Sequence, residues 1–390
     1  MARVFHLLTE SEPFSEYHGG AISRWTANVV RFEEDTIVLA PAADDSWSID
    51  SSRVRIVEGL SAYKRFNKGG GYRLPWAILT SILSRILGRA LHDLQAGDTV
   101  WIHNRPDFAL ALEPLVRRRG ARLFLHLHNS HLVEWSERVT RAFAADCYVF
   151  VSRFLQDEAL INRFYLKRTE VLYNGADHRI FYPNSIPRSP EDVPVVLFAS
   201  RLVPEKGLHV FLEAMELLQK RKVRIRGVVV GGAGFGDSSP TAYVTEMQRR
   251  APSNIKFESY CSGSALGDRF RSADIFCLPS CWQEPLGMAA LEAMACALPI
   301  VATNSGGLPE TLSCGGGILV ARESVPELAA ALGVLATDTD LRIRLAKEAY
   351  DSFQANYTWD TVRANYRKIL LSTADESVKS ESSAEGVVSS

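Results

Sequence analysis

Short apolar segments rich in β-branched residues alternate with amphipathic segments along most of the chain. In the first half, this pattern predicts strands at residues 3–8, 36–40, 53–57, 99–103, 122–128 and 147–151. In the second half, it predicts strands at residues 195–200, 226–232, 254–258, 273–280 and 299–303, and helices near 207–220 and 264–272. Buried strands separated by helices are typical of parallel sheets covered on both faces. The predicted fold class is therefore α/β.

One segment interrupts the alternation. Residues 182–194 contain four prolines and show no apolar periodicity, which is typical of a linker. A chain of 390 residues also exceeds what one hydrophobic core usually organises. We therefore expect two doubly wound, Rossmann-like domains, residues 1–181 and 195–356. Such sheets bind ligands at the carboxyl ends of their strands, so we expect the site in a cleft between the domains.

The last residues differ from the rest in composition. Residues 357–371 have the spacing of an amphipathic helix, which we expect to cross over and pack back on the N-terminal domain. Residues 372–390 are rich in serine and acidic residues and nearly lack large apolar side chains. That composition predicts a disordered tail.

Composition and charge narrow the class of protein. The chain is 46% hydrophobic and 23% charged with a net charge of -1, which indicates a globular protein and disfavours nucleic acid as a partner. Its six cysteines include no C-x-x-C pair, as in proteins that keep reduced thiols. The first apolar run is too short for a signal peptide, and no run approaches the roughly 20 apolar residues of a spanning helix. We expect a cytoplasmic location.

Residues 53–94 are unusually basic. They hold eight Lys and Arg against Glu58 and Asp93, interleaved with the apolar sequence WAILTSILSRILG. One interpretation is peripheral docking on an anionic membrane, such as the inner face of the cytoplasmic membrane. The alternative is a partly buried helix with solvated arginines.

The segment EPLGMAALEAMACALP, residues 284–299, carries the most specific chemistry. Pro285 suits a first helical turn, which would make Glu284 the cap residue, and the small side chains that follow let phosphate or sugar oxygens approach the backbone. In a regular helix Glu292 would lie about 12 Å farther along the axis. The two carboxylates of a glycoside hydrolase are about 5–9.5 Å apart, so this pair fits two grips on one elongated, hydroxyl-bearing ligand better. The alternative is that Glu284 merely caps the helix and Glu292 is solvated.

Residues 284–310, EPLGMAALEAMACALPIVATNSGGLPE, resemble the E-x7-E signature of the retaining glycosyltransferases of family 4, which have the GT-B fold of two facing domains. The resemblance extends to residues 199–218, 228–234, 273–280 and 19–25. It implies transfer of a sugar from a nucleotide-diphosphate sugar to an acceptor hydroxyl, with retention and without a metal or other cofactor. The implied acceptor is a glycan or a lipid-linked glycan, as in bacterial polysaccharide, lipopolysaccharide or glycolipid synthesis.

The same resemblance implies roles for individual residues. Glu284 would contact the donor sugar and Glu292 the ribose, Arg201 and Lys206 would neutralise the diphosphate, and His128 would touch the transferred sugar. The other implied donor-binding residues are Gly19, Gly20, Gly232, Pro285, Leu286, Gly287 and Met288. The implied acceptor-binding residues are His103, Asn104 and His131.

Some positions depart from the family pattern. Asn129 stands where Asp or Thr is common, which puts acceptor activation by a neighbouring carboxylate in doubt, and Ser200 and Ser259 replace usual glycines. The sequence Asp-Thr-Asp at 338–340 imitates a metal-binding D-x-D motif, but between two predicted helices it indicates helix capping.

Two other functions fit the same sequence. One is a nucleotide-sugar 2-epimerase of similar two-domain build, which needs no acceptor. The other is a coat or scaffold protein that keeps the fold without turnover; retention of Glu284, Glu292, Arg201 and Lys206 disfavours it.

Overall fold

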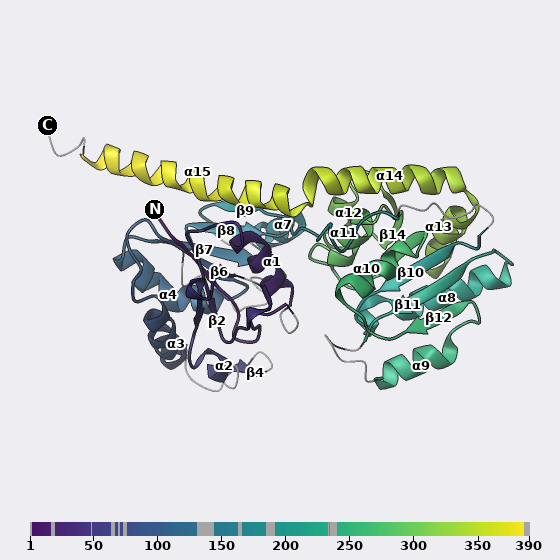
Figure 1. Cartoon of the computed structure of the whole chain (residues 1–390), viewed down its shortest axis with the longest axis horizontal. Coiled ribbons are helices and arrows are strands. Elements are labelled where there is room, and N and C mark those ends of the chain that lie inside the picture. The colour runs from purple at the N-terminus through teal and green to yellow at the C-terminus, as the bar shows by residue number, and fades with distance from the viewer. Residues whose placement is uncertain are drawn as a thin grey trace.

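A computed structural model describes the chain except for a set of short segments. These are residues 1, 17–19, 48, 64–66, 69–70, 73–75, 131–143, 163–165, 185–191, 233, 235–239 and 386–390. The described residues form two α/β domains, each built on a parallel sheet (Figure 1). The predicted fold class is confirmed.

The first domain contains a seven-stranded parallel sheet in the order β3-β2-β1-β6-β7-β8-β9. The strands are β1 (Val4–Leu7), β2 (Thr36–Ala40), β3 (Val54–Ile56), β6 (Thr99–His103), β7 (Arg122–Leu127), β8 (Cys147–Phe150) and β9 (Thr169–Val171). The helices are α1 (Ala21–Val30), α2 (Leu60–Tyr63), α3 (Trp76–Ala90), α4 (Pro106–Arg118) and α7 (Arg153–Ile161), and β4 (Asn67–Lys68) pairs with β5 (Gly71–Tyr72). The alternating strand residues therefore pack on helices on both faces of the sheet.

The second domain contains a six-stranded parallel sheet in the order β12-β11-β10-β13-β14-β15. The strands are β10 (Val195–Ala199), β11 (Arg226–Val230), β12 (Ile255–Glu258), β13 (Ile275–Leu278), β14 (Ile300–Thr303) and β15 (Gly317–Val320). The helices are α8 (Leu208–Lys220), α9 (Ala242–Arg250), α10 (Gly263–Arg271), α11 (Met288–Ala295), α12 (Leu308–Thr311), α13 (Val325–Thr337) and α14 (Thr339–Asn356), with a 3-10 turn at Pro204–Lys206. Asp338 caps α14 by accepting a hydrogen bond from Leu341 N at 2.8 Å, so the capping interpretation of residues 338–340 is confirmed.

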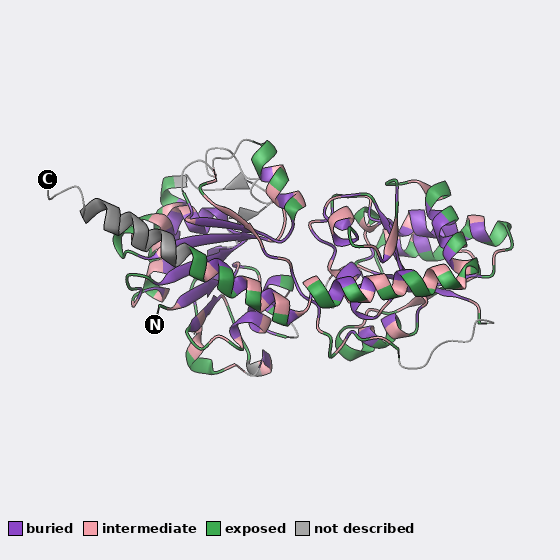
Figure 2. Cartoon of the chain, turned by 90° about the horizontal axis from the view of Figure 1, so that it is seen from above, coloured by how far each residue is buried: buried purple, intermediate pink, exposed green. Residues whose placement is uncertain are grey.

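The final helix, α15 (Trp359–Glu385), leaves the second domain and lies along the first (Figures 1 and 2). Trp359, Val362, Tyr366 and Ile369 join the buried cluster on the α1 side of the first sheet, which includes Trp25 and other large side chains. Burying each large apolar side chain contributes roughly 1.5–3 kcal/mol, so this contact firmly attaches the helix to the first domain.

Three expectations differ from the structure. α15 continues to Glu385 instead of ending at residue 371, so residues 372–385 extend the helix although serine is their commonest residue. Strands β9 and β15 were not predicted: β9 is short and only partly buried, and β15 begins after a run of glycines. α11 begins at Met288, because Gly287 has left-handed backbone angles that a helix cannot include.

The basic segment is partly internal. Arg55 pairs with Asp93, and Arg53 donates to the Glu33 carbonyl, so both serve packing. α3 buries its leucines and exposes Arg85 and Arg89. For the described residues this is the arrangement of a partly buried helix with solvated arginines. Within the part of the chain that the structure describes, no helix is long and apolar enough to span a bilayer.

Candidate active site

Glu284 lies in a buried turn between β13 and α11. Its Oε1 atom accepts hydrogen bonds from Lys206 Nζ at 2.6 Å and from Ser280 Oγ at 2.5 Å, and the residue is 4% exposed. The Lys206 ammonium also lies 4.8 Å from the centroid of the Trp282 ring. The prediction that Glu284 caps the helix is wrong, because the helix starts four residues later. The axial spacing of 12 Å therefore does not apply, since only Glu292 is on the helix.

The turn around Glu284 is held by a second loop, which follows β14. Gly307 N donates to the Glu284 carbonyl at 2.7 Å, and Thr311 Oγ1 donates to the Leu286 carbonyl at 2.9 Å. Gly306 has φ +60, and a Cβ atom there would lie 2.1 Å from the Glu284 carbonyl oxygen. The sequence S-G-G is thus required for the two loops to touch.

Glu292 is on α11, the helix that follows the Glu284 turn. Burial raises the pKa of Glu292 to about 7, and the positive charge of Arg24 on α1 opposes that shift. Because Arg24 belongs to the first domain, Glu292 is sensitive to how the two domains approach each other. A carboxyl group with such a pKa is a marker of a functional site.

Arg201 follows β10 and is exposed. Among the residues that the structure describes, its guanidinium has no ion-pair partner. The neighbouring backbone is tied to the next strand end, since Leu202 N donates to the Gly232 carbonyl at 2.8 Å. Arg201 and Gly232 therefore lie at the carboxyl edge of the second sheet, and Lys206 from the following turn reaches Glu284. The resemblance to family 4 glycosyltransferases predicts the donor at this edge. Pro285, Leu286 and Met288 flank that turn.

Gly20 lies at the start of α1 in the first domain. Ser23 N at this helix start donates to Glu12 Oε1 at 2.8 Å, and a Cβ atom on Gly20 would lie 2.9 Å from the same oxygen. Burial raises the pKa of Glu12, although these backbone donors oppose the shift. The Glu12 carboxylate, which sequence reasoning missed, therefore occupies the helix start near the predicted donor loop. Gly19 lies outside the described residues.

The predicted histidines meet at the carboxyl ends of β6 and β7. His103 Nδ1 and His128 Nε2 are 3.0 Å apart, and the Asn104 Oδ1 atom accepts a hydrogen bond from His128 N at 2.6 Å. Both ring nitrogens of His103 contact other histidines and the residue is fully buried, so the prediction that His103 contacts the acceptor is not compatible with this structure. His131 lies outside the described residues.

His126 joins this cluster from the next position on the same face of β7. Its ring centroid is 4.1 Å from that of His128 and 4.8 Å from that of Trp25. One nitrogen each from His103, His126 and His128 lie within 4.8 Å of one another, a set that could hold a metal ion. The contact between His103 and His128 already engages one nitrogen of each.

Glu310, also missed by sequence reasoning, connects the domains. Its carboxylate, from α12 of the second domain, accepts hydrogen bonds from Arg153 N at 2.8 Å and Tyr173 Oη at 2.6 Å in the first domain. It therefore caps α7 of the other domain. Asn174 Nδ2 also lies 3.4 Å from Met288 Sδ. Glu310 ends the quoted sequence GGLPE, but only the fold shows which helix it caps.

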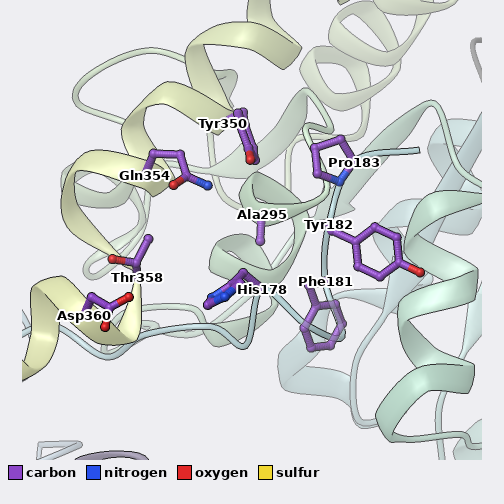
Figure 3. Close-up of a pocket in the computed structure, with 9 residues that line it drawn as sticks. All are labelled: His178, Phe181, Tyr182, Pro183, Ala295, Tyr350, Gln354, Thr358 and Asp360. Atoms are coloured by element: carbon purple, nitrogen blue, oxygen red, sulfur yellow. The ribbon is translucent and has the colours of Figure 1, made fainter. Parts of the chain in front are cut away.

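A pocket of about 260 Å³ lies at the junction of α11, α14, α15 and the linker (Figure 3). Its lining combines rings and polar groups, including His178, Tyr182, Tyr350, Gln354 and Asp360. None of the predicted site residues lines it, so it is separate from the candidate active site.

These two facing parallel-sheet domains and the carboxyl-edge site between them define a protein of the GT-B fold. Among solved structures, HepE from Anabaena in complex with UDP and glucose is similar with a TM-score of 0.70 and 19% identity, covering 95% of this chain and 100% of that chain. Residues 184–352, which make up most of the second domain, match the sequence profile of the family described as "Glycosyl transferases group 1".

Two curated relatives extend the comparison beyond the second domain. The first is the GDP-mannose-dependent alpha-(1-6)-phosphatidylinositol monomannoside mannosyltransferase of Mycolicibacterium smegmatis, 28% identical over 93% of this chain and 98% of that protein. The second is spore coat protein SA of Bacillus subtilis, 26% identical over 69% of this chain and 76% of that protein. The similarity therefore spans both domains.

Proposed function

We propose that this protein transfers a sugar from a nucleoside diphosphate sugar to an acceptor hydroxyl, with retention of anomeric configuration and without a metal. The observation that carries the proposal is the buried pair of Lys206 and Glu284 at the carboxyl edge of the second sheet. A cation for phosphate and an acceptor for sugar hydroxyls are both held there, in a domain that matches a glycosyltransferase family profile.

In this mechanism the second domain binds the donor. Arg201 is free to pair with the diphosphate, and Lys206 shares its ammonium between Glu284 and the phosphate oxygens. Glu284 accepts hydrogen bonds from the sugar, and Glu292 accepts them from the ribose. When the bond between the anomeric carbon and the diphosphate oxygen breaks, these cations stabilise the negative charge that develops on the leaving group.

The acceptor oxygen then attacks the anomeric carbon from the face that the diphosphate leaves. Its proton passes to an oxygen of the departing diphosphate, so no protein nucleophile is required. The acceptor reaches this point from the first domain, where Asn104 and His128 end their strands. Closure of the domains, which Glu310 links, excludes water from the reaction.

The relatives suggest where to look for substrates. The mannosyltransferase relative is GDP-mannose-dependent, and the HepE structure holds UDP and glucose. We propose an acceptor that is a glycan or a lipid-linked glycan, as in bacterial polysaccharide, lipopolysaccharide or glycolipid synthesis. The protein would work in the cytoplasm, at the inner face of the membrane, with Arg85 and Arg89 of α3 available for anionic lipid.

The proposal is tested with a panel of nucleotide sugars that starts with GDP-mannose and UDP-glucose. A true donor raises the unfolding temperature by mass action, and product formation with a hydroxyl acceptor in the presence of EDTA is then followed by NMR of the anomeric proton. Retained configuration with EDTA-resistant turnover is the expected result. An inverted product, or activity that returns only with added metal, contradicts the corresponding part of the mechanism.

An assay without acceptor and two variants separate the transferase from the competing functions. Epimerisation of a free nucleotide sugar without acceptor would replace the transferase with an isomerase. Similarity to spore coat protein SA supports a second alternative, a coat protein without turnover. If Glu284→Ala and Arg201→Ala leave nucleotide-sugar binding unchanged, the result would support the coat-protein alternative. We expect instead that Glu284→Ala chiefly lowers turnover, whereas Glu292→Ala chiefly weakens binding of the free nucleoside diphosphate.

A further inference from the structure

A line of hydrogen-bonded rings connects α15 to His128. The Tyr366 hydroxyl lies 2.9 Å from His6 Nε2, His6 Nδ1 lies 3.2 Å from His103 Nε2, and His103 Nδ1 lies 3.0 Å from His128 Nε2. Tyr366, His6 and His103 are fully buried. The three histidines come from neighbouring strands β1, β6 and β7, whereas Tyr366 comes from the other end of the chain.

Every ring in this line is neutral. Burial lowers the pKa of His6 to about 3 and that of His128 to about 3, and burial beside the other two rings lowers the pKa of His103. Burial raises the pKa of the Tyr366 hydroxyl, which therefore keeps its proton. A neutral imidazole has one N–H donor and one acceptor nitrogen. Each histidine between two partners must then donate to one and accept from the other, so all the hydrogen bonds point in the same direction.

Tyr366 selects the direction. Its hydroxyl has no other hydrogen-bond partner among the residues that the structure describes, so it either donates to His6 or leaves its buried proton unpaired. A phenol is a better donor and a poorer acceptor than imidazole. Donation by Tyr366 makes His6 donate from Nδ1 to His103, and His103 donate from Nδ1 to His128 Nε2. His128 must then carry its proton on Nδ1.

We propose that Tyr366, His6 and His103 are positioning residues that hold His128 in one orientation and as its Nδ1–H tautomer. Nδ1 of His128 is buried and has no hydrogen-bond partner within the described ranges, so no other contact there competes with the line for the choice of tautomer. The consequence for turnover rests on the proposed function, since it requires that His128 lies beside the transferred sugar. The tautomer itself does not depend on that function.

The tautomer is measured on the full-length protein labelled with 15N-histidine, by long-range 1H–15N correlation. In the wild type, His128 should show a protonated Nδ1 and an unprotonated Nε2. Tyr366→Phe removes the donor at the start of the line and should lower the Nδ1–H to Nε2–H ratio of His128 by about fivefold to tenfold, the effect of losing one hydrogen bond. Tyr148→Phe is the matched control, because it removes another buried tyrosine hydroxyl, bonded to Ala145 N at 3.2 Å. It should leave His128 unchanged.

Turnover with an identified donor provides the second measurement. Tyr366→Phe should lower kcat by about fivefold or more while the KM for the donor stays within twofold, and Tyr148→Phe should change neither. If Tyr366→Phe does not fold, His6→Gln interrupts the line at the next residue and should shift the same tautomer.

Three results would overturn the proposal. These are a wild-type His128 protonated on Nε2, a His128 tautomer that is insensitive to Tyr366→Phe, and stoichiometric metal in the purified protein with His103 and His128 as ligands, because a metal would take the nitrogens that the hydrogen bond uses. If the tautomer behaves as expected but no nucleotide sugar is turned over, the proposed function fails and the positioning line stands.

Discussion

Removing the Glu284 carboxylate should destabilise the second domain as well as impair catalysis. The Glu284 and Lys206 side chains are only 6% and 12% exposed, and their 2.6 Å contact is joined by the 2.5 Å bond from Ser280. Glu284→Ala leaves an ammonium group nearly buried and unpaired. Breaking such a pair costs about 3–5 kcal/mol, and the remaining exposure of Lys206 places the expected loss near 3 kcal/mol of unfolding free energy.

Glu284→Gln separates the charge from the contacts. The amide oxygen still accepts from Lys206 and Ser280, so we expect a loss of about 1–2 kcal/mol, because the hydrogen bonds remain but are no longer charge-assisted. Both variants should lose turnover, since Gln does not restore the carboxylate that would orient the sugar.

The assay is urea denaturation of the full chain followed by far-UV circular dichroism, with Lys206→Met and the double variant Lys206→Met, Glu284→Gln completing a cycle. The double variant should be more stable than the sum of the two losses predicts, because neither buried charge is left alone. If Glu284→Ala costs less than 1 kcal/mol, or if Ala and Gln are equally destabilising, the pair is not the buried interaction described here.

The remaining predictions concern pH, a glycine and a free cation. The folded protein binds the Glu292 proton more tightly than the unfolded chain does, so the free energy of unfolding should fall by about 1–3 kcal/mol as pH rises from 4.5 to 7. Binding of a nucleoside diphosphate should strengthen over the same range. Glu292→Gln should remove both pH dependences. Gly306→Ala should lower both the unfolding temperature and turnover. Gly263→Ala is the control: its φ of +57 is similar, but no atom lies within 4 Å of the new Cβ, so it should cost only backbone strain. Equal effects of the two variants would show that the close approach of Gly306 to Glu284 is unimportant. Arg201→Ala should change stability by less than about 0.5 kcal/mol yet weaken donor binding at least tenfold, with the exposed Arg221→Ala as control; unchanged donor affinity would remove Arg201 from the site.

Much of the fold was predictable because its signals are local. β2 and β6 coincide with the predicted segments, since a buried parallel strand is a short, uniformly apolar run with clear ends. The same reasoning missed β15, whose sequence GILV follows glycines and is only partly buried. It also missed the start of α11, where Pro285 suggested a first turn but the left-handed backbone of Gly287 delays the helix to Met288.

The sequence by itself determined the alternation of strands and helices, the two-domain α/β class and the residue types that the site contains, because hydrophobic period, turn residues and motif spacing are properties of neighbouring positions. Only the tertiary structure decided that Glu284 pairs with Lys206, that Glu310 caps a helix of the other domain, and that Tyr366 reaches His128 through two histidines. These contacts join residues 78, 157 and 360 positions apart. They depend on strand order and domain packing, which no local pattern encodes.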